Sequence, residues 1–222
     1  MALFDQNQSF EKKIFIHSLI FPFFLALIMF FLKLVEYLEG TSFAFLGIYP
    51  LDVKSLGGIL LTPLIHGDWG HLISNLFSFL VLSISLFYFY RGIAYRTFFI
   101  IYICSGIFVW LFGRESYHIG ASGVIYGLAA FLLFSGIIRN HIPLMAISLM
   151  VIFLYGSMVW GIFPLHINLP YSWEAHLGGT ITGLILAIIL RNKGPQRKVK
   201  VWDDEDGTED FSDFENMKIS DH

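Results

Sequence analysis

Residues 120–138 read Gly-Ala-Ser-Gly-Val-Ile-Tyr-Gly-Leu-Ala-Ala-Phe-Leu-Leu-Phe-Ser-Gly-Ile-Ile. The run contains no charged residue, and from Ser122 to Ile138 it approaches the ~20 apolar residues that a helix needs to cross a bilayer core. Gly123 and Gly127 lie one helical turn apart, so that another helix can come close on their shared face. The stretch therefore predicts a membrane-spanning helix with a second helix packed directly against it.

A second stretch carries a matching pattern of small residues. Ala175, Gly179 and Gly183 recur at helical spacing within Ala-His-Leu-Gly-Gly-Thr-Ile-Thr-Gly. Two stripes of this kind suit each other as a tight contact between helices. Such a contact would bring Ser122 and His176, both near the outer ends of their helices, within hydrogen-bonding reach.

The composition supports an all-α membrane protein. Hydrophobic residues make up 56% of the chain and charged residues only 14%, against about a quarter in ordinary soluble domains. The apolar residues lie in long blocks rather than alternating with polar ones, which indicates membrane spans. Six stretches fit, with ends uncertain by roughly 2–4 residues. They are Ile14–Val35, His71–Tyr90, Thr97–Phe112, Ser122–Ile138, Ile142–Phe163 and Ala175–Leu190.

Lysine and arginine predict the orientation of these spans. If the N-terminus lies inside, eleven basic residues fall on the inner side and three on the outer side, which is a clear positive-inside bias. Both termini are then cytoplasmic. The chain divides into a cytoplasmic segment 1–13, one six-span domain 14–191 and a cytoplasmic tail 192–222. The outer basic residues are Lys33, Lys54 and Arg114.

Two segments outside the spans have unusual compositions. The first external connection, from Glu36 to Gly70, is apolar but contains Pro50 and Pro63, so we expect an irregular segment in the membrane interface rather than one regular helix. The tail begins basic and then becomes acidic, with nine of the 17 acidic residues in 203–221. We expect its basic part to contact anionic lipid headgroups and its acidic part to be disordered.

Polar residues within predicted spans are candidates for function, because burying them in a bilayer costs several kcal/mol unless they find partners. His71 and Asn75 are four residues apart and therefore share a helix face. Each could instead make a structural contact between helices. Ser122 could be an ordinary helix cap, but Gly120 before it permits close approach or positive φ.

Together these residues suit acyl-transfer chemistry. A neutral imidazole, here His176, can remove the proton of the Ser122 hydroxyl and return it to a leaving amine. His71, Asn75 and the Ser122 N–H are candidate donors to the oxyanion. Tyr126 lies one turn after Ser122 and could pack against the imidazole, or be a plain interface aromatic.

The sequence favours a Ser–His dyad over a triad. Glu174 and Asp68 are the nearby carboxylates, and neither has a persuasive spacing for a third member. His66 and His118 flank the motifs. Each either lines a water-filled entrance to the site or is an ordinary loop residue. There is no His-Glu-x-x-His pattern or comparable cluster of metal ligands, so we expect no metal. We also expect no cofactor and no nucleic-acid partner. Cys104 is the sole cysteine, which excludes an intrachain disulfide.

The motifs His71-x-x-x-Asn75, Gly120-Ala-Ser122-Gly123 and Ala175-His176-Leu-Gly-Gly179, in this order, resemble the rhomboid family of intramembrane proteases over about 63–190. The resemblance implies a six-span bundle of the minimal bacterial type. It implies Ser122 as nucleophile, His176 as base, His71 and Asn75 in the oxyanion hole, and Tyr126 stacked on the base.

The resemblance also implies what such a protein acts on and where. Family members cleave single-pass membrane proteins in or near the spanning helix, and the segment from Leu165 to Glu174 matches their mobile cap. The expected location is a bacterial cytoplasmic membrane, with the active site opening outward. Two supporting features of many members are missing: an arginine in the first external loop, and a glutamate near the inner end of the second span.

Three other functions remain as alternatives. A noncatalytic rhomboid-like protein would bind membrane clients without cutting them, although the presence of both Ser122 and His176 argues against it. A transporter or channel would be expected to show an inverted repeat or interrupted spans, which the sequence lacks. A purely structural membrane protein would not need this set of polar residues.

Overall fold

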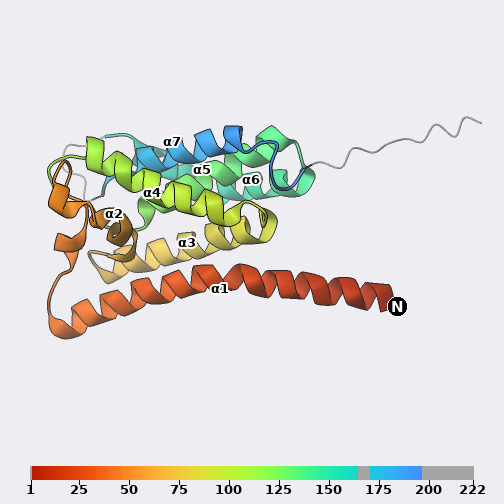
Figure 1. The fold of residues 1–222 in the computed structure, drawn as a ribbon, viewed down its shortest axis with the longest axis horizontal. Helices are drawn as coiled ribbons and strands as arrows, with labels where there is room; N and C mark the ends of the chain where they lie inside the picture. The colour runs from red at the N-terminus through yellow and green to blue at the C-terminus, as the bar shows by residue number, and fades with distance from the viewer. Residues whose placement is uncertain (1, 165–170, 197–222) are drawn as a thin grey trace, which may run out of the picture.

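The computed structural model describes residues 2–164 and 171–196 as an all-α bundle (Figure 1). Residues 165–170 of the predicted cap and residues 197–222 of the predicted tail lie outside the described residues. Six helices form the body: α1 (Ala2–Glu39), α3 (Trp69–Phe89), α4 (Ala94–Phe112), α5 (Ser122–Arg139), α6 (Ile142–Tyr155) and α7 (Trp173–Ile189).

Five of the described helical segments are long and apolar enough to cross a membrane: Gln8–Glu39, Trp69–Phe89, Ala94–Phe112, Ser122–Arg139 and Ile142–Ile162. Helix α7 carries the sixth predicted span but has only 17 residues. At 1.5 Å per residue it is about 26 Å long, slightly less than the ~30 Å hydrocarbon core. Five spans are therefore found by length and composition, and the sixth remains a prediction.

Two predicted spans differ in detail from the helices that contain them. Helix α1 begins at Ala2 and therefore extends beyond the N-terminal end of the predicted span Ile14–Val35, because no helix-breaking residue precedes the apolar run. The fifth predicted span, Ile142–Phe163, agrees with the apolar helical segment Ile142–Ile162, but this segment is not one continuous α-helix. Helix α6 ends at Tyr155, and the chain continues as the 3-10 segment η4 (Gly156–Ile162).

The connection between α1 and α3 is irregular, as its prolines and glycines predicted. It contains three short 3-10 turns, η1 (Ala44–Leu46), η2 (Val53–Ser55) and η3 (Thr62–Leu64), and the single turn α2 (Gly58–Leu61). It covers one end of the bundle, where α3, α5 and α7 all begin (Figure 1).

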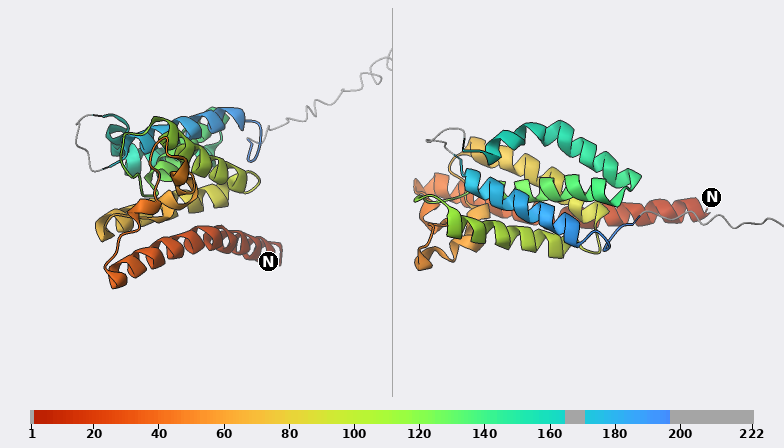
Figure 2. Two further views of the ribbon diagram at one scale, coloured as in Figure 1. Left: turned by 60° about the vertical axis from the view of Figure 1, so that its left-hand side comes forward. Right: turned by 90° about the horizontal axis from the view of Figure 1, so that it is seen from above.

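Helix α5 lies at the centre of the bundle, and 12 of its 18 residues are buried. Helices α4 and α6 pack against it, α7 runs along both α5 and α4, and α1 contacts the bundle mainly through α3 (Figure 2). Large apolar side chains on the outside of the bundle are exposed, among them Phe23, Phe31, Phe77 and Phe153. An apolar exterior of this kind suits a lipid environment.

The two glycine stripes meet as the sequence predicted. A methyl group on Gly179 would overlap the carbonyl oxygen of Gly123, and one on Gly183 would overlap that of Gly127. The backbones of α5 and α7 are therefore in direct contact, with no room for a side chain between them. This contact fixes the position of the first turn of α7 relative to the first turn of α5.

We predict that Gly179→Ala destabilises the protein by about 1–3 kcal/mol or more, because two helix backbones must separate to admit the methyl group. Gly92→Ala is the matched control: nothing lies within 4 Å of its added carbon, so its effect should stay within about 0.5 kcal/mol. Thermal unfolding of both variants in detergent is the measurement. Equal melting temperatures would contradict the backbone contact.

Candidate active site

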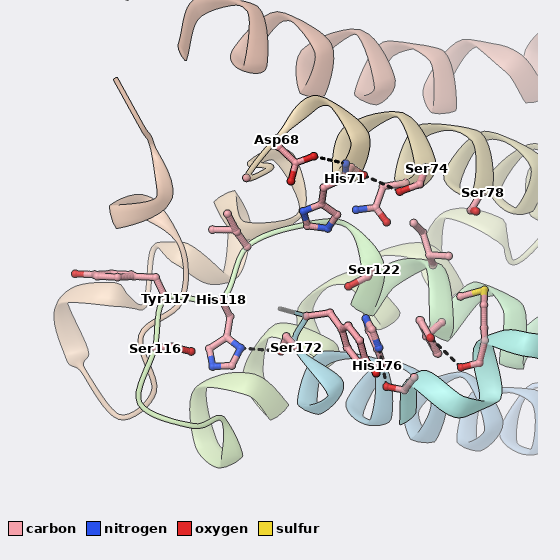
Figure 3. A pocket seen from close by; sticks show the side chains of 18 of the residues that line it. Asp68, His71, Ser74, Ser78, Ser116, Tyr117, His118, Ser122, Ser172 and His176 are labelled. Atoms are coloured by element: carbon pink, nitrogen blue, oxygen red, sulfur yellow. Dashed lines mark hydrogen bonds between the residues drawn. The ribbon is translucent and has the colours of Figure 1, made fainter. Parts of the chain in front are cut away.

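A cavity of about 580 Å³ lies at the end of the bundle where α3, α5 and α7 begin. Its wall includes five residues singled out from the sequence: His71, Asn75, Ser122, Tyr126 and His176. They come from three helices and are separated by up to about a hundred positions in the chain. The structure thus brings the predicted site residues together (Figure 3).

Ser122 is the first residue of α5, and the chain reaches it through Gly120. Gly120 has φ +108°, a conformation that residues with a side chain rarely adopt. An added carbon there would lie 2.7 Å from Cε1 and 2.9 Å from Nε2 of His71. Gly120 is therefore needed both for the turn into α5 and for the close approach of His71 to the backbone beside Ser122.

The imidazole of His176 is fixed on several sides. Its Nδ1 lies 2.8 Å from the carbonyl oxygen of Gly161, which can only accept, so Nδ1 carries the proton and Nε2 is the basic nitrogen. The ring of Tyr126 stacks on it with centroids 4.0 Å apart and planes 6° apart. The Tyr126 hydroxyl donates to the carbonyl of Met158 at 2.8 Å. Orientation and tautomer of His176 are thus both set by its neighbours.

Ser122 and His176 are neighbours in the close-up view (Figure 3), and no direct hydrogen bond joins these two described side chains. Such bonds are often long before substrate binds. Glu174 makes no hydrogen bond to His176 either, since its carboxylate is engaged elsewhere. The arrangement is a serine–histidine pair oriented by a backbone carbonyl and an aromatic ring.

Asn75 is the unsatisfied group of the site. Its side chain is 8% exposed, and its Nδ2 has no hydrogen-bond partner although it is buried. A buried amide donor without a partner costs about 1–3 kcal/mol, so it calls for an explanation. An added carbon on Gly120 would lie 3.5 Å from this nitrogen, which places the donor beside the backbone that leads into Ser122. Asn75 can therefore donate to a ligand atom held at Ser122.

Polar contacts that the sequence did not reveal hold the start of α7. The Arg114 guanidinium lies 3.4 Å from the Glu174 carboxylate and donates to the Tyr171 carbonyl at 2.9 Å. The imidazole of His118 donates through Nε2 to the Arg114 carbonyl at 3.0 Å and accepts from the Ser172 hydroxyl, with 2.7 Å between Nδ1 and Oγ. We call these five residues the clasp.

The clasp tethers the turn before His176 to the loop between α4 and α5. Glu174, weighed from the sequence only as a catalytic carboxylate, is 1% exposed and serves this ion pair instead. Tyr171 also stacks on His176, with centroids 5.6 Å apart. A hint existed in the sequence, because Arg114 is one of only three basic residues predicted on the outer side.

The sequence left open whether His66 lines the cavity or is an ordinary loop residue. In the structure it does not line the cavity. It is 1% exposed, packs edge-on against the His71 ring with centroids 5.1 Å apart, and accepts a 3.4 Å hydrogen bond from the Ala121 N–H. Lys33 on α1 donates to its carbonyl at 3.0 Å. His66 thus supports both His71 and the turn before Ser122. His118 does line the cavity.

Within 2–164 and 171–196 there is no group of three or more His, Cys, Asp or Glu side chains that could hold a metal ion.

Comparisons with known proteins agree with this architecture. Residues 54–193 match the Rhomboid domain family. Uncharacterized proteins of Mycobacterium bovis and Mycobacterium tuberculosis are 33% identical over 185 residues, covering 78% of this chain and 74% of theirs. A Bacillus subtilis protein named "Putative rhomboid protease YdcA" is 31% identical over 144 residues, covering 62% of this chain and 69% of its own.

We predict that acid destabilises the fold partly through His66. Burial, and next the nearby His71, lower the pKa of His66 from 6.5 to about 3. Below pH 6.5 the unfolded chain therefore binds a proton that the folded chain does not. The free energy of unfolding should fall as the pH drops from 6.5 towards 3, with a slope approaching about 1.4 kcal/mol per pH unit for this one group.

Melting temperatures of the wild type and His66→Gln in detergent, recorded from neutral to acidic pH, test this. His66→Gln should be less stable at neutral pH but flatter in its pH profile. Parallel profiles would show that His66 does not contribute to acid sensitivity.

Proposed function

The chain belongs to the rhomboid family, and on that premise we propose that it is an intramembrane serine endopeptidase that cleaves the spanning segments of single-pass membrane proteins. The single observation that carries the proposal is the partnerless Asn75 amide, which lies in one cavity with a serine and an oriented histidine.

The proposed reaction begins with the transfer of the Ser122 proton to Nε2 of His176. The Ser122 oxygen then attacks the scissile carbonyl, and negative charge develops on the carbonyl oxygen. His176 returns the proton to the leaving amine as the peptide C–N bond breaks. A water molecule, deprotonated by the same imidazole, hydrolyses the acyl-enzyme and restores the serine.

Three donors can stabilise the developing oxyanion. They are Nδ2 of Asn75, a ring nitrogen of His71 and the backbone N–H of Ser122. The last belongs to the free first turn of α5, where the helix dipole also favours negative charge. Because the Asn75 donor is already buried and has no other partner, little reorganisation is needed as the charge forms.

The walls of the cavity suit a polypeptide entering from the side. Ser74 and Ser78 of α3 form one wall, and Ser157, Met158 and Gly161 of η4 form another. Hydroxyl groups and the carbonyls of a 3-10 segment can bond to substrate backbone that has unwound from a helix. They also give water a polar route to a reaction placed among apolar helices. This favours substrates whose spanning helix is locally unstable.

The placement in the membrane is part of the proposal. With both termini cytoplasmic, as the distribution of lysine and arginine favours, the cavity opens to the outer side of a bacterial cytoplasmic membrane. Helix α7 then acts as the sixth span. The described beginning of α1 and the end of α7 lie at the same end of the bundle, opposite the cavity, which supports this arrangement (Figure 1).

A noncatalytic protein that binds membrane clients is the second candidate, since the same cavity could hold an unwound helix without cutting it. The two functions differ in what Ser122 must do. Client binding needs only the shape and polarity of the cavity, whereas cleavage also needs the serine oxygen and the basic nitrogen.

We predict that Ser122→Ala and His176→Ala each reduce cleavage of a fluorescent single-span substrate in liposomes by at least about 10⁴-fold. Ser116→Ala, which removes another hydroxyl from the same cavity, is the matched control and should retain activity. Binding of an uncut substrate should survive Ser122→Ala. Cleavage that persists in Ser122→Ala would overturn the nucleophile, and a wild type that binds substrates without cutting them would favour client binding.

We also predict that Asn75→Ala lowers kcat by about 10²-fold while KM changes little, because the lost donor acts mainly on the oxyanion. Stability should not suffer from the loss of a hydrogen bond, since Nδ2 makes none in the free protein. Ser85→Ala on the same helix, whose hydroxyl bonds only to the Val81 carbonyl, is the control. A change confined to KM would assign Asn75 to substrate binding instead.

A further inference from the structure

A second cavity lies at the opposite end of the molecule from the candidate active site. It has a volume of about 430 Å³, within the ~300–1,000 Å³ usual for ligand sites. Its walls come from the first half of α1, the end of α3, the α3–α4 turn and the start of α4. The residues that line it are Phe10, Lys13, Ile14, His17, Ser18, Ile20, Phe87, Arg91 and Tyr95.

The shape of this cavity follows from the course of α1. Pro22 lies inside the helix and cannot donate a backbone hydrogen bond, which bends helices. The Ser18 hydroxyl donates to the carbonyl of Phe15 at 2.7 Å, a contact that also favours bending. Figure 1 shows α1 curving near its middle, so that its N-terminal half leaves the bundle and runs past the ends of α3 and α4.

The floor of the cavity is apolar, and two of its lining residues, Phe87 and Tyr95, belong to a cluster of aromatic rings. The ring of Phe21 packs against Phe87, Tyr95 and Phe98, with centroids 5.1–5.4 Å apart. Phe87 and Tyr95 also meet edge-on at 4.8 Å. This aromatic cluster holds α1 to α3 and α4 at the level of the cavity, and it offers a surface for hydrocarbon.

The rim of the cavity is cationic. Lys13 and Arg91 face it from two different elements, and none of its lining residues is acidic. The nearest carboxylate along α1, Glu11, accepts a 3.0 Å hydrogen bond from the hydroxyl of Tyr88. Arginine presents a planar fork of donors that matches phosphate oxygens, and lysine adds a point charge.

We propose that this cavity binds one anionic glycerophospholipid, with its phosphate between Lys13 and Arg91 and an acyl chain along Ile14, Phe87 and Tyr95. The position fits such a ligand, because the predicted inner boundary of the membrane runs through the start of the first apolar run and the turn after Tyr90. Phosphates of the inner leaflet lie at this level. A free phosphate ion would contact only Lys13 and Arg91 and would not cover the apolar floor of the cavity.

The proposed lipid would connect α1, which lies outside the family match, to helices that lie within it. The family match begins at residue 54, so α1 precedes it, whereas Arg91 and Tyr95 lie within it. A lipid held between Lys13 and Arg91 would therefore fasten α1 to the family core at the inner end of the bundle. The inference concerns lipid binding and does not depend on whether the protein cleaves peptides.

Titration of the delipidated full chain in detergent, followed by native mass spectrometry, tests the site with three probes: phosphatidylglycerol, phosphatidylcholine and inorganic phosphate. The variants are Lys13→Gln/Arg91→Gln and the control Lys12→Gln/Arg96→Gln. The control removes the same charge from exposed residues at the same end that do not line the cavity. Melting temperatures without lipid check that both variants fold.

At about 1 kcal/mol per basic residue, Lys13→Gln/Arg91→Gln should weaken phosphatidylglycerol binding by about thirtyfold, and the control by no more than about threefold. Wild-type protein should prefer phosphatidylglycerol to phosphatidylcholine and should keep its lipid in excess inorganic phosphate. Equal loss in the two double variants would mean a diffuse charge effect and overturn the site. Displacement by inorganic phosphate would assign the rim to the free ion, and equal binding of phosphatidylcholine would remove the role of charge.

Discussion

The contact between the backbones of α5 and α7 is the constraint on which the rest of the site depends. Gly179 and Gly183 place bare helix backbone directly against the carbonyls of Gly123 and Gly127. In a bilayer no hydrophobic force draws helices together, so close van der Waals packing of small residues must hold them. Because this contact lies next to the first turns of both helices, it also sets the distance between the serine on one and the histidine on the other.

Around this contact, neighbouring groups fix the His176 imidazole and the turn that precedes it. The Gly161 carbonyl and the Tyr126 ring fix the imidazole of His176, and the clasp holds the turn before it. The Asn75 amide donor, by contrast, is buried without a partner. In the proposed reaction, this donor would stabilise the developing oxyanion with little reorganisation.

The two ends of the bundle carry cavities of different chemical character. One end collects the polar residues of the candidate active site beneath the irregular segment between α1 and α3 (Figure 3). The other end has a cationic rim over an aromatic floor and lies where α1 bends away. The proposed cleavage would require a fixed depth in the membrane, so that Ser122 meets the cleavage site. A lipid bound at the inner end would help to set that depth without touching the reaction.

The sequence by itself determined the class of fold, the approximate spans, the pairing of α5 with α7 and the candidate pair of Ser122 and His176. These follow from hydrophobic length and helical spacing, which are local properties of the chain. Only the tertiary structure decided that a backbone carbonyl orients His176, that Glu174 pairs with Arg114, and that the fifth span ends in a 3-10 segment. Backbone carbonyls have no sequence signature, and an ion pair across sixty residues depends on how whole helices are placed.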